Sequence, residues 1–368
     1  MTARRTVLWS LGVFALVRVA QVAGLVLAPQ RGSRATLDLL TKSDALWYMR
    51  IAQNGYAPPP PIGPDGIYTR TPDLAFFPLY PATIRLFSWA VDVRLAAVLA
   101  TLMAGAVATV LMTLWAIPRT GEVGAVTLVA VWSLWPASVV LSMGYSEALF
   151  TATVAGCLLA LQRGAWVWAA FACALAGLTR PVGAALLVAL VAALLVRRPP
   201  LRSWLTALVV APLGLLASLT HVAIVTGRWD GWFWLERTVW KSGFDGGSSL
   251  LAALSSMLPG GTVAPVPTWI VSGVTVLVAL VLLAWLLLSR PPVEEWVFAV
   301  LAFVMGVGGA NYVHCKPRFL LPVLPLFAAP SRALARLPRP ALVLLGAVAL
   351  GLSVWWSVYL LAVWPRSV

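Results

Sequence analysis

The sequence predicts an all-α, polytopic membrane protein of about eleven transmembrane helices, with no soluble domain. Of its 368 residues, 61% are hydrophobic and only 10% are charged, whereas about a quarter of the residues of a soluble globular protein are charged. The apolar residues form many runs that approach the roughly 20 residues a helix needs to cross a bilayer. Backbone groups in lipid must be hydrogen-bonded within the protein, so these runs are expected to be helices.

The predicted spans follow one another along the chain. They cover residues 7–28, 95–117, 123–141, 147–162, 165–179, 182–196, 203–226, 269–289, 294–311, 318–331 and 341–362. The first run follows Arg4 and Arg5 and therefore resembles a secretory signal. Its length and the many later spans instead predict an uncleaved first helix. We expect residues 1–368 to form one transmembrane domain.

Arginines in the short loops predict how the chain is oriented. Cytoplasmic loops of membrane proteins carry an excess of basic residues. The short loops on the side of the N-terminus contain Arg119, Arg163, Arg197, Arg198, Arg202, Arg290, Arg332, Arg336 and Arg339. We therefore expect a multi-pass plasma-membrane protein with a cytoplasmic N-terminus. The basic residues behind the net charge of +14 are explained by this topology and by contact with anionic lipid headgroups. No nucleic-acid partner is therefore expected.

Two long segments, residues 29–94 and 227–268, are expected on the outer face, and both are rich in Trp, Tyr, Gly and Pro. The outer loops also contain basic residues that the loop rule does not predict: Arg31, Arg34, Lys42, Arg50, Arg70, Arg228, Arg237, Lys241, Lys316 and Arg318. Long loops are translocated regardless of charge, so these residues have two interpretations. They are tolerated surface charge, or they form a site for an anionic, phosphate-bearing substrate.

The first outer segment contains the strongest candidate for a catalytic acid. Residues 43–56 are expected to form a short amphipathic helix at the membrane interface. At 3.6 residues per turn, one face of this helix carries Asp44, Trp47, Tyr48 and Ile51. Asp44 is either a catalytic carboxylate or only a helix cap, because Ser and Asp both cap helices well.

Residues 73–81 form a second unusual segment in the same outer region. Pro78 and Pro81 exclude a regular spanning helix, and aromatic residues surround them. We expect a rigid segment that enters the membrane from outside. An aromatic belt at the interface would explain the rings but not the paired prolines.

Together these two segments resemble the PIG-V family of mannosyltransferases, a GT-C superfamily group known from GPI-anchor assembly, with bacterial relatives. The resemblance rests on Asp44-x-x-Trp47-Tyr48-x-x-Ile51-Ala52-x-x-Gly55-Tyr56 and on Ala75-Phe76-Phe77-Pro78-Leu79-Tyr80-Pro81. Weaker matches follow at Pro136-Ala137-Ser138, Tyr145-Ser146-Glu147-Ala148-Leu149-Phe150 and Arg318-Phe319-Leu320-Leu321-Pro322. The matches extend over residues 44–325. Ser43 departs from the family, which often has Trp before the aspartate.

The resemblance implies an integral membrane glycosyltransferase with GT-C-like outer loops that carry short interfacial helices. Such enzymes use a lipid-phosphate sugar donor and act on the outer or lumenal face, with a carboxylate of the first outer loop as catalytic base. Asp44 matches that position, and Asp73 and Glu147 are possible second acids. The implied reaction transfers mannose from polyprenyl-phosphate mannose with inversion to an α-mannoside. A carboxylate suits this reaction because the attacking hydroxyl must lose a proton.

The same resemblance implies a leaving group, polyprenyl phosphate, whose negative charge grows during the reaction. Arginine pairs well with phosphate. The residues expected to bind the donor phosphate are Lys316 and Arg318 first, then Arg50, Arg70 and Arg180. The residues expected to line the substrate are Trp47, Tyr48, Tyr56, Phe77, Tyr80, Tyr145 and His314.

Some polar and aromatic residues have open interpretations. The run containing Trp229, Trp232, Trp234 and Trp240 either stacks on sugar rings or anchors the loop at the interface. Arg18 lies in the middle of the first span, where a charge is costly, so it is expected to face the protein interior or to snorkel.

No cofactor is predicted. The sequence has no phosphate-cradling loop, dinucleotide fingerprint or zinc-ligand spacing, which disfavours a nucleotide-sugar donor. A divalent ion stays open only if the fold brings Asp44, Asp73 and Glu147 together. The cysteines Cys157, Cys173 and Cys315 do not suggest a disulfide. The expected partners are the polyprenyl-phosphate sugar, membrane lipids and a lipid-linked, glycan or protein acceptor.

Two other functions are compatible with parts of this sequence. A transporter or flippase of a lipid-linked sugar would also need an outer basic cavity, but transporters often have repeated halves, and none is visible here. A structural partner in a cell-envelope complex is the other alternative. An inactive homologue of that kind is expected to have lost the loop acid, whereas Asp44 is present.

Overall fold

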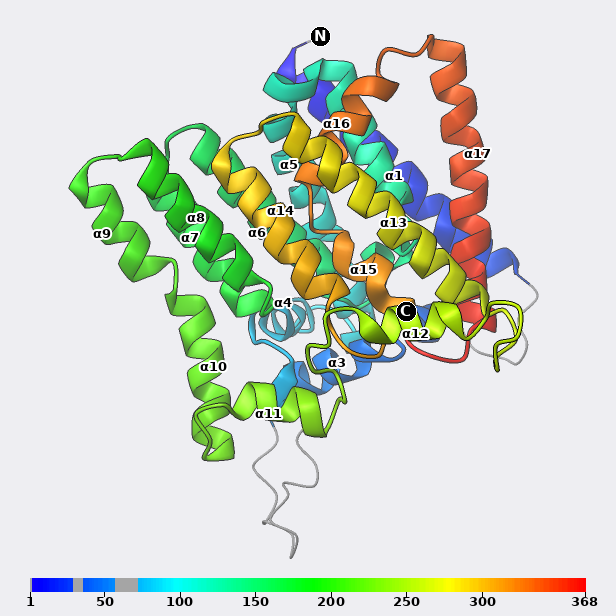
Figure 1. The fold of residues 1–368 in the computed structure, drawn as a ribbon, viewed down its shortest axis with the longest axis horizontal. Coiled ribbons are helices and arrows are strands. Elements are labelled where there is room, and N and C mark those ends of the chain that lie inside the picture. The colour runs from blue at the N-terminus through cyan, green and yellow to red at the C-terminus, as the bar shows by residue number, and fades with distance from the viewer. Residues whose placement is uncertain (1, 29–35, 57–71) are drawn as a thin grey trace, which may run out of the picture.

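A computed structural model describes residues 2–28, 36–56 and 72–368, and within these ranges every regular element is a helix (Figure 1). The predicted all-α class is confirmed. The bundle is built from α1 (Ala3–Leu27), α5 (Val93–Leu134), α6 (Glu147–Gln162), α7 (Trp166–Thr179), α8 (Gly183–Arg197), α9 (Leu201–Val210), α10 (Leu213–Thr226), α13 (Pro267–Leu288), α14 (Val293–Val307), α16 (Pro325–Leu334) and α17 (Arg339–Val358).

Several of these helices are long and apolar enough to cross a bilayer by length and composition. Among the described residues, these segments are Ala3–Leu27, Val93–Leu134, Leu201–Thr226, Pro267–Leu288 and Arg339–Val363, the last of which adds the π-helical turn Tyr359–Val363 to α17. The apolar helices α6, α7 and α8 are shorter. The number of spans, about eleven, stays a prediction.

The longest element, α5, consists of two arms that meet at Gly121. This residue has φ 74° and ψ 176° inside an otherwise helical segment, a conformation that glycine adopts without the steric cost of a side chain. The arms correspond to the predicted spans 95–117 and 123–141. The connection between them therefore takes very few residues, as expected for the short loop that contains Arg119.

The second arm of α5 ends at Leu134, earlier than the predicted residue 141. Pro136 disfavours the helical conformation of the residue before it, and the chain continues as the 3₁₀ turn η2 (Ser138–Ser142). Arg18, which is only 4% exposed, donates hydrogen bonds to the backbone carbonyls of Ser133 and of the first residue of η2. This arginine therefore faces the protein interior, where it satisfies one carbonyl that the end of α5 leaves free and one at the start of η2.

Proline also divides two other predicted spans. The span 203–226 is interrupted between α9 and α10 at Pro212, and the span 318–331 is replaced by α15 (Lys316–Leu320) and α16, with Pro322 between them. Proline lacks the backbone N–H that continues a helix and clashes with the preceding turn. The prediction of one continuous helix over residues 318–331 was therefore wrong.

Short helices gather at the end of the bundle opposite the N-terminus, where Figure 1 shows α3, α11 and α12. The first outer segment forms α2 (Thr36–Leu40), α3 (Asp44–Asn54), the 3₁₀ turn η1 (Pro72–Ala75) and α4 (Leu79–Phe87). The second forms α11 (Gly231–Thr238) and α12 (Ser248–Ser255). Pro81 lies in the first turn of α4, where its missing N–H costs nothing.

Buried ion pairs hold the other end of the bundle. The Arg119 guanidinium contacts Glu295 with 2.8 Å between Nε and Oε1, and Arg197 contacts Glu294. Both acids lie in the first turn of α14, where a negative charge is favourable for the helix dipole. These pairs join α14 to α5 and α8 far from the short helices.

Candidate active site

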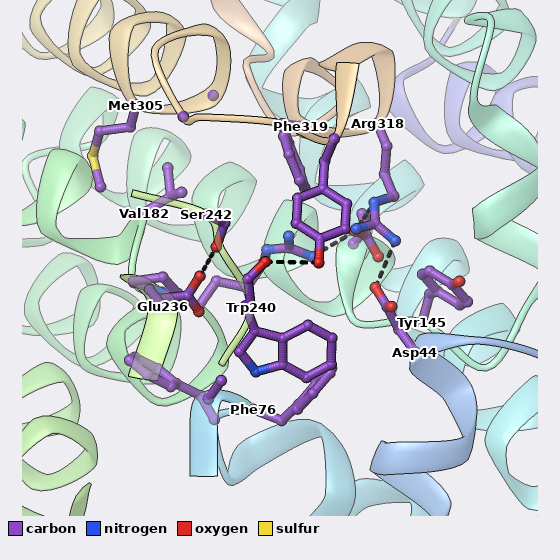
Figure 2. A pocket seen from close by; sticks show the side chains of 18 of the residues that line it. Asp44, Phe76, Tyr145, Val182, Glu236, Trp240, Ser242, Met305, Arg318 and Phe319 are labelled. Carbon is purple, nitrogen blue, oxygen red and sulfur yellow. Dashed lines mark hydrogen bonds and ion pairs between the residues drawn. The ribbon is translucent and has the colours of Figure 1, made fainter. Parts of the chain in front are cut away.

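A cavity lies among the short helices and the broken helix ends, and Figure 2 shows it from close by. Its walls come from α3, η1, the connection between α7 and α8, α11 and the chain after it, and residues 305–319. Many residues that the sequence predicted for a site line this one cavity: Asp44, Tyr48, Phe77, Tyr145, Glu147, Arg180, Lys316 and Arg318. Tertiary folding thus gathers residues from Asp44 to Arg318 at one place.

Asp44 begins α3 and projects its carboxylate toward Arg318, with 2.7 Å between Oδ2 and Nη1 (Figure 2). Ser43 before it has a φ of 59°, a conformation that costs a non-glycine residue about 1–3 kcal/mol. The Ser43 side chain makes no capping hydrogen bond. This geometry favours a chemical role for Asp44 over a role as a cap, because its carboxylate is held at the cavity wall.

Asp44 belongs to a line of four alternating charges. The Arg318 guanidinium pairs with Asp44 and also lies 3.3 Å, Nε to Oε1, from Glu147. Glu147 in turn accepts a hydrogen bond of 2.5 Å from Nη1 of Arg180. The acid at the start of α6 is only 1% exposed, so burial is tolerated because each charge has a partner. Two of the predicted phosphate-binding arginines are therefore already paired with acids.

Lys316 supplies a further buried cation on the cavity wall. Its side chain is 1% exposed, and its ammonium donates a hydrogen bond to the backbone carbonyl of Gly309. Burial lowers the pKa of this lysine. The indole of Trp135 donates a 2.9 Å hydrogen bond to the carbonyl of Pro317, which anchors α15 to the end of α5. That anchor positions Lys316 and Arg318 together.

The chain before α15 has an unusual conformation. Asn311 and Tyr312 have φ angles of 57° and 42°, which are costly for non-glycine residues. They are held by contacts to the second outer segment: the Tyr312 hydroxyl donates to the Trp240 carbonyl at 2.9 Å, and the Asn311 N–H donates to Ser249 Oγ at 2.9 Å. The strained turn therefore joins the second outer segment to the cationic helix α15.

Glu236 on α11 is a cavity residue that the sequence reasoning missed. Its carboxylate accepts a hydrogen bond from the Ser242 hydroxyl (Figure 2). Burial, aided by the negative charge of Asp44, raises the pKa of Glu236 to about 7, against the opposing effect of that hydrogen bond. In the sequence, Glu236 is an acid within the tryptophan-rich run. The interpretation of that run considered only its tryptophans.

The tryptophans of that run have different environments. Trp232 and Trp240 line the cavity, and their indole nitrogens donate hydrogen bonds to backbone carbonyls of η1, at Ala75 and Pro72. Trp229 is 93% exposed. The two interpretations therefore apply to different members of the run: Trp232 and Trp240 face the site, whereas Trp229 suits an interfacial anchor.

Three residues predicted to line the substrate pack behind the wall instead. The Tyr80 hydroxyl lies 2.6 Å from Oγ1 of Thr101 in the core. Tyr56 donates to the Phe76 carbonyl at 2.7 Å. Trp47 contacts the Trp240 ring with centroids 6.0 Å apart. These rings support the lining residues.

The remaining predicted site residues lie elsewhere. Arg50 is exposed on α3 above Trp47, and Asp73 is buried in η1 outside the cavity wall. His314 packs against the Trp364 ring, 5.6 Å between centroids, and burial together with the charge of Arg318 lowers its pKa to about 4. The prediction for Arg70 lies outside the described residues.

The described ranges contain no cluster of three or more His, Cys, Asp or Glu side chains that could hold a metal ion. Asp44 and Glu147 approach each other through Arg318 instead, and Asp73 does not line the cavity. Arg318 therefore occupies the position between the two acids that a bridging ion would need.

The cavity combines groups for proton transfer with groups for binding an anion. A carboxylate at the wall can accept a proton from a bound hydroxyl group. Buried guanidinium and ammonium groups stabilise a negative charge more strongly here than in water, because the surroundings are less polar. Apolar rings, among them Phe76, Trp232 and Trp240, form part of the same wall. This combination suits displacement of an anionic leaving group by a hydroxyl.

Comparison with known proteins identifies the fold. No family model and no curated protein matches the sequence. Among solved structures, the chain resembles ArnT from Cupriavidus metallidurans bound to undecaprenyl phosphate, with a TM-score of 0.58 and 16% identity over 94% of this chain. ArnT from the same organism in the apo state gives a TM-score of 0.54 and 15% identity over 90% of this chain.

The chain therefore has a membrane fold of the GT-C type, as the sequence predicted. It covers 63% and 60% of the length of the two ArnT chains. At such low identity the likeness is one of fold. The resemblance to the PIG-V family rests on the sequence motifs.

Proposed function

We propose that this protein is an integral membrane glycosyltransferase that uses a polyprenyl-phosphate sugar as donor. The motifs that resemble the PIG-V family favour mannose as the sugar and an α-mannoside, formed by inversion, as the product. The acceptor is a lipid-linked, glycan or protein hydroxyl on the extracytoplasmic side. The fold likeness to ArnT, one structure of which contains undecaprenyl phosphate, supports a lipid-phosphate donor.

One observation carries the proposal: Asp44 shares a cavity with Arg180, Lys316 and Arg318. The volume of this cavity is about 270 Å³, near the lower limit of about 300 Å³ for small-molecule sites. It suits a sugar phosphate but not a whole polyprenyl chain. The lipid tail would therefore extend from the cavity between helices into the bilayer.

In the proposed reaction, Asp44 is the general base. The acceptor oxygen attacks the anomeric carbon of the donor sugar, and its proton passes to the Asp44 carboxylate. The bond between the anomeric carbon and the phosphate oxygen breaks, and both electrons leave with the polyprenyl phosphate. The extra negative charge on that phosphate is stabilised by Lys316 and Arg318. No cofactor is needed to balance these steps.

Arg318 is suited to couple the two halves of this reaction. It contacts the proposed base directly, with 2.7 Å between its Nη1 and Oδ2 of Asp44, and it lies on the wall with Lys316. When Asp44 takes up a proton, its attraction for the guanidinium falls. Arg318 then becomes available to the phosphate at the moment when the negative charge of the phosphate increases.

The sidedness is part of the proposal. The connections α6–α7, α8–α9, α13–α14 and α16–α17 lie toward the end of the molecule that carries the N-terminus (Figure 1). Most of the arginines predicted for the short loops lie in these connections or in the adjoining helix turns, whereas the cavity lies at the other end. A cytoplasmic N-terminus, as the loop charges favour, would put the cavity on the extracytoplasmic face of the plasma membrane.

The first test is transfer of radiolabelled mannose from polyprenyl-phosphate mannose in membranes that contain the wild type or Asp44→Asn. Loss of a general base lowers the rate by about 10²- to 10⁴-fold. Asp38→Asn is a matched control, because Asp38 lies in the same outer segment but pairs on the surface with Arg94. We expect Asp38→Asn to transfer label at the rate of the wild type.

Other outcomes would redirect the assignment. Equal transfer by the wild type and Asp44→Asn would overturn Asp44 as the base and make Glu147 or Asp73 the candidate. Absence of transfer by the wild type, with a broad acceptor extract and other lipid-linked sugars, would contradict the enzymatic function. Flipping of a lipid-linked sugar would then be measured in vesicles.

A further inference from the structure

Glu236 is a charged cavity residue that the proposed reaction does not use. It lies on α11, so the second outer segment supplies it, whereas Asp44 comes from the first. In Figure 2, Trp240 lies between the pair of Glu236 and Ser242 on one side and the pair of Asp44 and Arg318 on the other. The cavity therefore has an acidic position at Glu236 that is separate from the one formed by Asp44 and Glu147.

The Glu236 position is held in a fixed geometry. The Ser242 hydroxyl donates a hydrogen bond to the carboxylate, and the Ser242 N–H donates a 2.8 Å hydrogen bond to the Glu236 carbonyl. Both contacts join α11 to the chain that follows it. The side chain is thus aimed at the cavity by a local turn, with one carboxylate oxygen already occupied by Ser242.

Few charges of the described residues act on Glu236. The charged groups that influence it are Asp44 on α3 and Arg180 at the connection between α7 and α8. Val182 and Met305 line the same cavity, and Figure 2 shows Val182 on the side of the cavity where Glu236 and Ser242 lie. An acid with apolar neighbours and no close cation is costly to bury. Such a site favours a ligand that supplies neutral hydrogen-bond donors.

Two indole rings lie at the cavity wall beside this acid. The nitrogens of Trp232 and Trp240 are hydrogen-bonded to η1, so the rings are fixed in place. Trp240 is further braced by Phe76, whose ring centroid is 5.5 Å away at an angle of 74°. Fixed indoles offer large apolar surfaces at little entropic cost. A pyranose has a matching chemistry, with an apolar C–H face and hydroxyl groups at its edge.

We propose that Glu236 and Ser242, together with the indoles of Trp232 and Trp240, form a subsite that binds the hydroxyl groups of the donor's sugar ring. This inference rests on the proposed function and extends it, because it assigns sugar selection to the second outer segment. The phosphate end of the donor lies at Lys316 and Arg318. Glu236 is then a specificity-determining residue, whereas Asp44 is still the general base of the reaction.

The test measures binding, so it does not depend on turnover. Purified protein is titrated with undecaprenyl phosphate and with undecaprenyl-phosphate mannose, glucose and galactose. The wild type is expected to bind one of the sugar lipids more tightly than the plain lipid phosphate. At about pH 8, above the pKa of about 7 of Glu236, its carboxylate is charged, and Glu236→Gln should weaken binding of that sugar lipid by roughly 10- to 100-fold, the effect expected for hydrogen bonds to a charged group.

The plain lipid phosphate is the internal control, since its affinity for Glu236→Gln should equal that for the wild type. Arg237→Gln is the matched variant, because Arg237 is the next residue of α11 and its side chain is 57% exposed. It should bind both lipids like the wild type. Trp232→Leu should also weaken the sugar lipid alone, whereas Trp229→Leu, at a residue 93% exposed, should not.

Monodeoxy analogues of the preferred sugar lipid identify the hydroxyl group that is bound. One analogue should bind the wild type weakly and lose no further affinity in Glu236→Gln, because both changes remove the same contact. The subsite would be overturned if every analogue lost as much affinity, relative to the parent sugar lipid, in Glu236→Gln as in the wild type.

Two further results would also overturn it. One is an equal loss of affinity for the plain and sugar lipids in Glu236→Gln, which would indicate a role in phosphate binding or folding. The other is unchanged affinity with a lower catalytic rate, which would make Glu236 a base. If the wild type binds no lipid phosphate at all, the proposed function fails instead, before the subsite is reached.

Discussion

At the scale of single residues, the site depends on how buried charges are paired. Arg318 is shared by Asp44 and Glu147, and its guanidinium also lies 5.1 Å from the centroids of the Tyr145 and Phe319 rings. A planar, always-charged group suits this position better than lysine does. The arrangement holds the proposed base at the cavity wall before any substrate binds.

We predict that Arg318→Ala destabilises the folded protein strongly. It leaves Asp44 without its ion-pair partner and removes one of two cations beside Glu147, and breaking a buried pair in this way costs about 3–5 kcal/mol. Thermal unfolding in detergent should show a clear fall in Tm. Arg332→Ala at the other end of the bundle is the control, and equal Tm values for the two variants would contradict the prediction.

The raised pKa of Glu236 predicts a pH-dependent stability. Its folded pKa of about 7 lies above the ordinary value of 4.5, so the folded state favours the protonated form. The stability from that proton is fully present below about pH 4.5 and is lost as the pH rises through about 7. Glu236→Gln, which mimics the protonated form, should flatten the fall in Tm between about pH 5 and pH 8.

The control for this measurement is Asp245→Asn. Burial alone would raise the pKa of Asp245, but the backbone and side-chain hydrogen bonds at the start of α12 outweigh it and lower the pKa to about 2, outside that pH interval. An identical slope of Tm against pH in the wild type and Glu236→Gln would show that Glu236 does not titrate there.

At the scale of elements, close helix contacts depend on glycine. A Cβ atom placed at Gly214 of α10 would lie 1.8 Å from the backbone carbonyl oxygen of Ala174 in α7. Small residues at such positions let helix backbones approach within a membrane. The contact carries α10 to the cavity side of the bundle, where α11 and Glu236 follow.

We therefore predict that Gly214→Ala lowers the stability by about 1–3 kcal/mol, the cost of overpacking a close contact. Gly346→Ala in α17 is a matched control, because no atom lies within 4 Å of a Cβ there. Alanine at that position should leave Tm unchanged or raise it, since it is the better helix former. A fall in Tm for Gly346→Ala equal to that for Gly214→Ala would contradict the packing argument.

At the scale of the whole molecule, the two ends of the bundle differ in chemistry. One end carries the N-terminus and most of the arginines predicted for the short loops, and the other carries the short helices α3, α11 and α12 (Figure 1). Residues of α3 and α11 line the cavity. The three cysteines are buried, so the protein gives little background reaction with thiol reagents. The reaction of an introduced cysteine therefore shows on which side of the membrane that residue lies.

We predict that Trp229→Cys reacts with a membrane-impermeant maleimide on intact cells, whereas Arg198→Cys reacts only after the membrane is opened. Both residues are exposed, and they lie in loops that the arginine distribution assigns to opposite faces. The reverse pattern would put the cavity in the cytoplasm and exclude an extracytoplasmic acceptor.

The sequence alone was sufficient for the class of the fold and for one half of the site. An apolar run is a local property, and in lipid the backbone N–H and C=O groups of such a run must form hydrogen bonds within the protein. An all-helical membrane protein therefore follows directly from the residues. Asp44, Lys316 and Arg318 could be chosen because their residue types and their motifs stood out. Helix ends were harder, since prolines such as Pro322 divide apolar runs that composition alone joins.

Only the tertiary structure decided which of the candidate residues meet. Tyr80 and Asp44 belong to motifs of similar prominence, yet Tyr80 packs in the core while Asp44 lines the cavity. Glu236 acquired its raised pKa from burial and from a charge far away in the chain. Pairing, burial and cavity shape depend on contacts between residues distant in sequence, whereas helix formation in lipid depends on neighbours. That difference is why the sequence determined the class of this protein and the fold determined its site.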